Sequence, residues 1–204
     1  MRAAKLKEDY SFIRGVCYGV PYYAPVEQVK RELGYGRRLK LNSTRIWLVY
    51  EHYKDNPERF IDGLKNYVRT AYEEGYTTMP ILFNGNGLNP DILEPEFKVE
   101  GEKYVSDVVN ALKDEPGLIM WDIMNEPSCN DYIMKSPEDE KEARLSKMWD
   151  FLRHYCRFVK GIDKDNPVTI GHTFRYDVEP TVEEVDVISV HDYLSTHKEV
   201  EATY

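Results

Sequence analysis

The sequence has few cysteines and no long apolar run. Polar residues interrupt every apolar run well short of the roughly 18 residues that a membrane-spanning helix requires. The N-terminal segment MRAAKLKEDYSF carries basic residues with no apolar stretch after them, unlike a secretory signal. Cys17, Cys129 and Cys156 are odd in number and scattered, which favours reduced thiols. We expect a cytoplasmic protein without a membrane span, although prior removal of a signal peptide would leave the same sequence.

Basic residues are also in short supply. The chain has 27 Lys and Arg residues against 36 Asp and Glu residues, and its formal net charge is −9. Nucleic acids and anionic membranes bind to basic surfaces, so we expect neither as a partner. The sequence also shows no metal-ligand spacing and no cofactor motif, and therefore predicts neither a metal nor a cofactor.

Alternating strand and helix patterns fill the chain. Apolar runs predict strands over 12–20, 43–50, 77–83, 118–124, 167–174 and 185–194. Helical periodicity, with capping signals, predicts helices over 26–33, 56–75, 104–112 and 136–161, and a short helical piece near 179–184. This alternation indicates an α/β fold with a parallel sheet, either an open doubly wound sheet or a (β/α)8 barrel. No G-x-G-x-x-G follows the first strand, which argues against a dinucleotide site.

Polar residues stand where the predicted strands end, and in a barrel this rim carries the chemistry. They are Arg45, Asn84, Asn125, Glu126, His172, His191 and Tyr193. Glu126 is the most informative, because WDIMNEPSCND places a carboxyl group between an amide and a proline after an apolar strand. Burial there would raise its pKa, and such an acid can protonate a glycosidic leaving oxygen at neutral pH. The alternative is a solvated loop glutamate.

Three segments resemble one enzyme clan. WDIMNEP resembles the fourth-strand signature of the retaining (β/α)8 glycoside hydrolases, most closely the family-five-like cellulase and mannanase group. LNSTRIWL resembles the second strand of that clan, and DVISVHDY resembles its sixth. The resemblance covers about residues 12–195. It implies a TIM barrel, here as one partial domain over 1–204, and a β-linked oligo- or polysaccharide as substrate.

The resemblance also implies roles for individual residues. Glu126 would be the catalytic acid/base, and Asn125 would bond the 2-hydroxyl of the sugar. Arg45 would favour the ionised nucleophile, while His191 and Tyr193 would line the sugar cleft. A structural ion pair for Arg45 and core positions for His191 and Tyr193 stay open as alternatives.

Two further rim residues have weaker claims. Asn84 and His172 are open equally to a substrate-binding role and to a structural one.

The sequence departs from the clan at its second carboxylate. The clan's nucleophile stands on a seventh strand, whereas HKEVEATY after the sixth strand is not a strand pattern, so Glu199 and Glu201 are rejected as nucleophiles. We therefore expect a TIM barrel truncated after the sixth strand, with exposed sheet edges that favour self-association or completion by a second chain. The alternative function is a non-catalytic carbohydrate-binding or interaction protein built on an incomplete barrel.

Overall fold

A single curled sheet organises the computed structural model, which describes residues 3–193 and 196–203. Within these residues six parallel strands pair in chain order from β1 to β6. They are β1 (Gly15–Cys17), β2 (Ser43–Trp47), β3 (Thr77–Asn84), β4 (Trp121–Asn125), β5 (Val168–His172) and β6 (Ser189–Val190). Each strand lies beside its successor, as in consecutive βα units.

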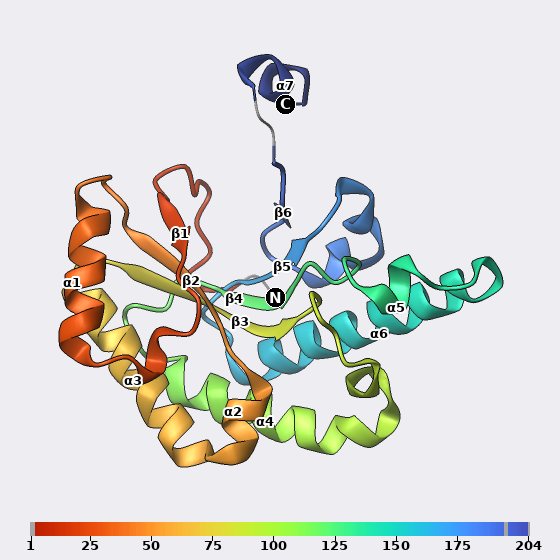
Figure 1. The fold of residues 1–204 in the computed structure, drawn as a ribbon, viewed down its shortest axis with the longest axis horizontal. Helices are drawn as coiled ribbons and strands as arrows, with labels where there is room; N and C mark the ends of the chain where they lie inside the picture. Colours follow the sequence, from red (N-terminus) through yellow and green to blue (C-terminus); the bar gives the residue numbers. More distant parts are fainter. Residues whose placement is uncertain (1–2, 194–195, 204) are drawn as a thin grey trace.

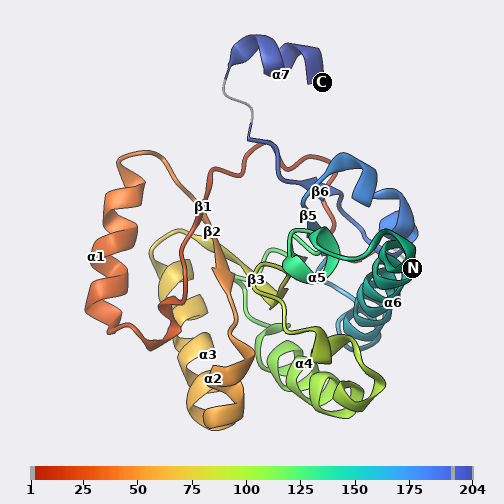
Figure 2. The same ribbon diagram turned by 45° about the vertical axis from the view of Figure 1, so that its right-hand side comes forward.

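Most of the helices cover the convex face of this sheet, whereas the helix His197–Thr203 stands apart from it (Figure 1, Figure 2). The α-helices are α1 (Val26–Arg37), α2 (Tyr50–Asp55), α3 (Pro57–Glu73), α4 (Lys98–Leu112), α5 (Asp131–Met134), α6 (Glu138–Ile162) and α7 (His197–Thr203). Short 3-10 helices are η1 (Pro21–Tyr23), η2 (Pro90–Leu93), η3 (Pro95–Phe97), η4 (Arg175–Asp177) and η5 (Glu179–Glu184). The fold prediction is confirmed: the described chain forms six parallel strands that curl, with their helices, into part of a (β/α)8 barrel.

Helix α3 illustrates how the local sequence builds one unit. The side chain of Asn56 accepts a hydrogen bond from the backbone amide of Arg59 at 3.0 Å, which caps the helix directly before Pro57. Phe60, Leu64 and Val68 recur at helical spacing and are fully buried. This apolar stripe holds the helix on the sheet.

The strand register brings the rim residues together. Asn84 at the end of β3 is paired with Asn125 at the end of β4, and Asn125 is paired with Gly171 on β5. All five residues of β4 are buried. The carboxyl ends of three neighbouring strands therefore meet at one edge, which is where active sites of such barrels lie.

The first and the sixth predicted strands are shortened most in the structure. The first, predicted as buried over 12–20, is limited to Gly15–Cys17 and is exposed, because in the described chain β1 pairs with β2 alone. The sixth, predicted over 185–194, is limited to Ser189–Val190, so His191 and Tyr193 lie just beyond it. Helix α2 starts inside the predicted second strand.

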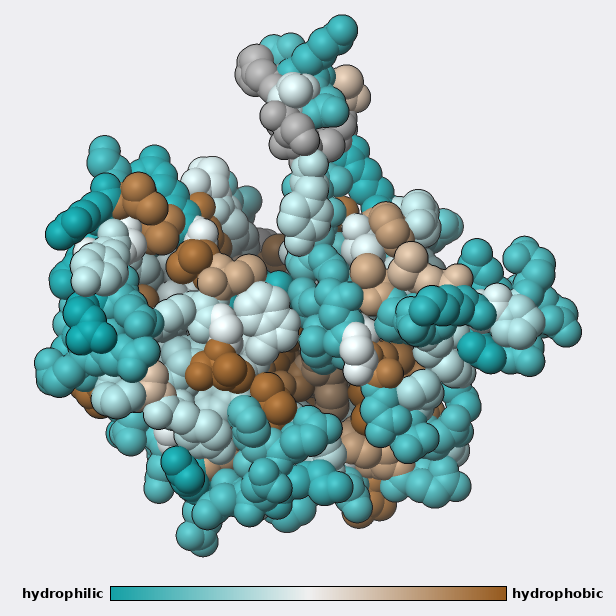
Figure 3. Space-filling model, viewed as in Figure 1, coloured by the Kyte–Doolittle hydropathy of each residue, from teal (hydrophilic) through white to brown (hydrophobic). Residues whose placement is uncertain are grey.

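The open side of the sheet leaves apolar side chains in contact with solvent. Val16 is 39% exposed, Val20 44% and Ile188 58%. Figure 3 shows apolar surface over β1 and the segment that follows it. The apolar edge is therefore a surface on which another strand could pair.

Within residues 3–193 and 196–203 no helix is both long and apolar enough to cross a membrane.

We expect the isolated 204-residue chain to associate through these edges. Unpaired backbone groups on β1 and β6, together with exposed apolar side chains at Val16, Val20 and Ile188, favour strand pairing between copies. Light scattering at several concentrations should show an apparent mass that rises with concentration. A monodisperse monomer across the whole range would contradict the prediction.

Candidate active site

A buried ion pair lies at the centre of the rim. Arg45 on β2 donates from Nε and Nη2 to Oδ2 of Asp122 on β4, at 2.9 and 2.7 Å. The side chains of Arg45 and Asp122 are 12% and 1% exposed. Burial alone would lower the pKa of Arg45, but the adjacent carboxylate outweighs burial and holds the pKa above its ordinary value. A charge in an apolar strand needs a partner, and the partner of Arg45 is Asp122. This contact is the structural ion pair that the sequence left open as an alternative role for Arg45.

Gly171 on β5 makes room for this pair. Its backbone amide donates to Oδ1 of Asp122 at 3.1 Å. A Cβ atom at this position would lie 2.6 Å from Nη2 of Arg45 and 3.2 Å from Oδ2 of Asp122. A residue with a side chain would therefore displace the guanidinium group from its partner.

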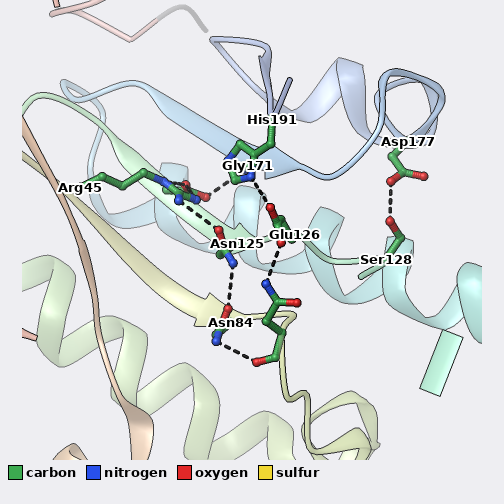
Figure 4. Close-up of polar contacts among 10 residues, drawn as sticks. Arg45, Asn84, Asn125, Glu126, Ser128, Gly171, Asp177 and His191 are labelled. Carbon is green, nitrogen blue, oxygen red and sulfur yellow. Dashed lines mark hydrogen bonds and ion pairs between the residues drawn. The ribbon is translucent and has the colours of Figure 1, made fainter. Parts of the chain in front are cut away.

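A chain of amide groups connects the ion pair to Glu126 (Figure 4). Nη1 of Arg45 donates to Oδ1 of Asn125 at 3.0 Å, and Nδ2 of Asn125 donates to Oδ1 of Asn84 at 3.0 Å. Asn84 in turn donates to the backbone carbonyl of Asn86 at 2.8 Å, and Nδ2 of Asn86 donates to Oε2 of Glu126 at 2.6 Å. Since arginine has no acceptor, Oδ1 of Asn125 must face Arg45, and this fixes the direction of the amides that follow.

The backbone at Glu126 is held in an unusual conformation. Its φ is +47°, in the left-handed region that residues other than glycine rarely adopt. Its amide donates to the carbonyl of Gly171 at 2.8 Å, and the amide of Gly85 donates to the carbonyl of Asn125 at 2.6 Å. Contacts on both sides thus stabilise a backbone conformation that turns the Glu126 carboxylate toward the rim.

Two hydrogen-bond donors contact the carboxylate of Glu126. Nδ1 of His191 lies 2.9 Å from Oε1, opposite the contact of Asn86 with Oε2. Burial raises the pKa of Glu126, but these donors and the nearby Arg45 lower it by more, so the pKa lies below its ordinary value. The expectation that burial would leave the pKa raised is therefore wrong for this arrangement, since hydrogen bonds to the ionised form outweigh desolvation.

A cavity of about 450 Å³ opens above this group. Its lining includes Cys17, Trp47, Asn125, Glu126, His191 and Tyr193. Tyr193 is 86% exposed and stands at the edge of the cavity.

The segment after Glu126 is fixed to the next loop. Ser128 Oγ donates to Oδ2 of Asp177 in η4 at 2.5 Å (Figure 4). Burial of that contact raises the pKa of Asp177.

The predicted site residues divide into two groups. Arg45, Asn84, Asn125, Glu126 and His191 come together in one hydrogen-bonded set, with Tyr193 at its edge.

His172 does not join this set. It is buried, and its Nε2 lies 3.1 Å from the hydroxyl of Thr181. Burial lowers its pKa to about 4, so His172 is a neutral core histidine.

Asp122, Asn86 and Gly171 were not identified from the sequence. Asp122 did carry a signal, because it is a charge within the apolar run LIMWDIM, as Arg45 is within its own strand. Among the described residues, His, Cys, Asp and Glu form no group of three that could hold a metal ion.

Comparisons with known proteins agree with this architecture. The probable mannan endo-1,4-beta-mannosidase C of Aspergillus terreus is 23% identical over 86 residues, which are 42% of this chain and 21% of that protein. The endo-beta-1,4-mannanase structure from Thermotoga petrophila has a TM-score of 0.66 at 17% identity, over 84% of this chain and 44% of that one. The Rhizomucor miehei endo-1,4-beta-mannanase structure has a TM-score of 0.66 at 16% identity, over 84% and 60%.

The chain resembles the family-five-like glycoside hydrolases in sequence and in fold. No protein-family model matches it. The chain spans about a fifth of the length of the Aspergillus relative and about half the length of the two glycoside hydrolase structures. At these identities the structural neighbours establish the fold alone.

Removal of the charge on Asp122 should destabilise the fold. In Asp122→Asn the guanidinium of Arg45 loses its countercharge, and breaking a buried pair costs about 3–5 kcal/mol. We expect about 3 kcal/mol, the lower end of that range, because Arg45 borders the cavity. Urea unfolding measures the change. The control is Asp131→Asn, which breaks an exposed pair with Lys135 and should cost under about 1 kcal/mol. Equal losses in both variants would refute a central role for the buried pair.

The lowered pKa of Glu126 gives a second expectation. Because the folded state prefers the ionised carboxylate, its contribution to stability is present above the ordinary pKa of 4.5 and is lost as pH falls through the lower folded value. Glu126→Gln should therefore reduce the free energy of unfolding near neutral pH, and the deficit should shrink well below pH 4.5. Denaturant titrations at both pH values test this, and a deficit independent of pH would argue against the hydrogen bonds to the carboxylate.

Proposed function

We propose that the chain carries the acid/base part of a retaining glycoside hydrolase that acts on β-linked glycans. The observation that carries the proposal is the placement of Glu126. It stands at the end of β4 in a cavity, held between His191 and Asn86, with Asn125 beside it. A carboxyl group fixed in this way can deliver a proton in one direction.

The reaction requires Glu126 in two protonation states. As an acid it protonates the glycosidic oxygen while a second carboxylate attacks the anomeric carbon and forms a covalent glycosyl-enzyme. As a base it then removes a proton from the water that hydrolyses this intermediate. The two carboxyl groups of retaining enzymes stand about 5–5.5 Å apart.

The surroundings of Glu126 suit the second state as they stand. His191 and Asn86 hold the pKa of Glu126 low, which favours the base. A negatively charged nucleophile nearby would raise this pKa through like-charge repulsion, which favours the acid. Covalent bonding to the sugar would neutralise the nucleophile and return Glu126 to its low pKa. The charge on the second carboxylate would thus switch the role of Glu126.

The nucleophile would come from a further strand. Of the described residues that line the cavity, Glu126 and Asp192 carry carboxyl groups, and Asp192 forms an ion pair with Arg175 at 2.7 Å. We therefore assign the nucleophile to a segment that pairs beyond β6. β-Mannan is the first substrate to test, because the names of the relatives specify mannan.

Glu126→Gln should cut hydrolysis of β-mannan by about 10²–10⁴-fold, the scale of general acid–base catalysis. The assay should use the longest reading frame that contains residues 1–204. Aryl β-glycosides with good leaving groups should lose less in the glycosylation step, because their departure needs little protonation. Glu138→Gln, on the exposed start of α6, is a matched control that should keep full activity. Near-normal hydrolysis of mannan by Glu126→Gln would remove Glu126 from the acid/base role.

A second candidate is a non-catalytic carbohydrate-binding protein on the same scaffold. The low pKa of Glu126 and the engagement of Asp192 with Arg175 favour it, since an acid and a nucleophile are both needed for catalysis. It would bind β-linked oligosaccharides without turning them over, in the longest reading frame as well as in residues 1–204.

A further inference from the structure

Glu126 begins a tight turn. The amide of Cys129 donates to the carbonyl of Glu126 at 3.1 Å, which closes a β-turn with Pro127 and Ser128 at its two central positions. The ring of Pro127 fixes one backbone dihedral angle of this turn. The left-handed φ of Glu126 comes directly before the proline, and a residue other than glycine keeps such a conformation only where its surroundings fix it. The direction of the Glu126 carboxylate therefore depends on the contacts that hold the turn.

Ser128 connects this turn to the loop after β5. Its Oγ donates to Oδ2 of Asp177 at 2.5 Å, and the two side chains point toward each other from different loops (Figure 4). Nδ2 of Asn130, by contrast, donates to the carbonyl of Pro127 at 2.7 Å and so stays inside the segment. Among the hydrogen bonds that residues 127–130 make within the described chain, the bond to Asp177 is the one that leaves the segment 126–134.

Asp177 is a fixed acceptor for this bond. Asp177 is 3% exposed and Ser128 6%, so water does not compete for the contact. The amide of Asp177 donates to the carbonyl of Phe174 at 3.1 Å, which holds its backbone in η4. Burial raises the pKa of Asp177, and hydrogen bonds from Ser128 and from the backbone of Phe174 favour its ionised form. A buried carboxyl group is strongly disfavoured when it loses a donor, so Asp177 keeps Ser128 in place.

We propose that the hydrogen bond between Ser128 and Asp177 positions Glu126, because it keeps the turn after β4 in the orientation that directs the carboxylate between Asn86 and His191. Ser128 and Asp177 are positioning residues, since neither lines the cavity of Glu126. The inference rests on the proposed function for its catalytic consequence, whereas the positioning itself is a property of the described chain. Without the bond the turn can rotate, and the contacts to both carboxylate oxygens lengthen.

The pKa of Glu126 is the quantity that reports this positioning. Burial raises it, whereas the hydrogen bonds from His191 and Asn86 and the charge of Arg45 lower it. The thiol of Cys129 is a further titratable group that interacts with Glu126. A change that only destabilised the fold would leave this balance as it is, but a rotated carboxylate would lose its donors and remain buried.

Ser128→Ala tests the proposal in the 204-residue chain. The pKa of Glu126 should rise by about one pH unit or more, because burial is then opposed by weaker hydrogen bonds. Carbon-13 NMR of the glutamate carboxyl groups measures the pKa, and the resonance of Glu126 is the one absent from Glu126→Gln. Ser128→Thr keeps the hydroxyl group and should keep the low pKa. An unchanged pKa in Ser128→Ala would overturn the proposal.

Ser136→Ala is the matched control. Oγ of Ser136 donates to the carbonyl of Ile133 at 2.7 Å, within the segment that ends α5. Its removal deletes one serine hydrogen bond of similar length that does not reach another loop. The pKa of Glu126 should stay unchanged in this variant, and an equal rise in Ser136→Ala and Ser128→Ala would overturn the special role of Ser128.

Asp177→Ala separates positioning from a direct electrostatic effect. A negative charge near Glu126 raises the pKa of its carboxyl group, so loss of that charge alone would lower the pKa. Loss of the acceptor for Ser128 would instead raise it, as in Ser128→Ala. We expect a rise, and a fall would overturn the proposal.

A milder variant covers the case in which Ser128→Ala does not fold. Ser128→Cys retains a weak S–H donor of similar size, so the pKa of Glu126 should rise by less than in Ser128→Ala. Urea unfolding gives a second measurement: in the Ser128→Cys background, the pH-dependent deficit caused by Glu126→Gln should shrink. No rise in pKa and a full deficit in this background would also overturn the proposal.

Turnover in the longest reading frame tests the catalytic consequence. A general acid is active only when protonated, so activity is lost as pH rises through its pKa. Ser128→Ala should therefore lower kcat for β-mannan and move the basic limb of the kcat/KM profile to higher pH. A raised pKa of Glu126 without hydrolysis by the wild type would retain the positioning and reject the enzyme. Hydrolysis that depends on Glu126, with an unchanged pKa and profile in Ser128→Ala, would reject the positioning and retain the enzyme.

Discussion

The buried contact between Arg45 and Asp122 is the interaction on which the rim depends. It joins β2 to β4, and through the amide of Gly171 it reaches β5. The same guanidinium orients Asn125, and Asn125 orients Asn84 at the end of β3. Without its partner, either charge would be stranded among apolar strands. The ion pair and its hydrogen bonds thus link four strands, and the positions of the side chains in the cavity wall depend on these contacts.

The side-chain amide of Asn125 makes two hydrogen bonds within this network. Its side-chain oxygen is occupied by Arg45, and its nitrogen by Asn84, so both ends of the amide already have partners. A sugar hydroxyl at Asn125 would share the nitrogen with Asn84 or displace it. The amide is consequently rigid before any ligand arrives, and rigid polar groups lose less entropy when they bind. Glu126 should likewise lose little entropy on binding, because its two carboxylate oxygens are held by different loops.

The alternation of strands and helices was predictable from the sequence, and so were the positions of Arg45 and Glu126 in or after their strands. Each of these features depends on a short stretch of sequence. Apolar periodicity defines the elements, and a charge in an apolar strand signals a polar centre. The partner of Arg45 lies 77 residues away, so its identity required the strand register. The pKa of Glu126 depends on Asn86 and His191, which the fold brings from two other loops. The exposure of β1 depends on what pairs with its outer edge, which local pattern cannot supply.

Gly85 links two loops more tightly than sequence separation suggests. A Cβ atom there would lie 2.1 Å from the carbonyl oxygen of Glu126, so the turn after β3 and the turn after β4 are in van der Waals contact, backbone to backbone. For protein engineering this divides the cleft into two regions. Residues 84–87 pack against the backbone and side chain of Glu126 and leave little freedom for redesign. The stretch from Leu88 to Phe97 has no such contact with Glu126 among those described, and libraries could vary this part of the cavity wall while the contacts that hold Glu126 are kept.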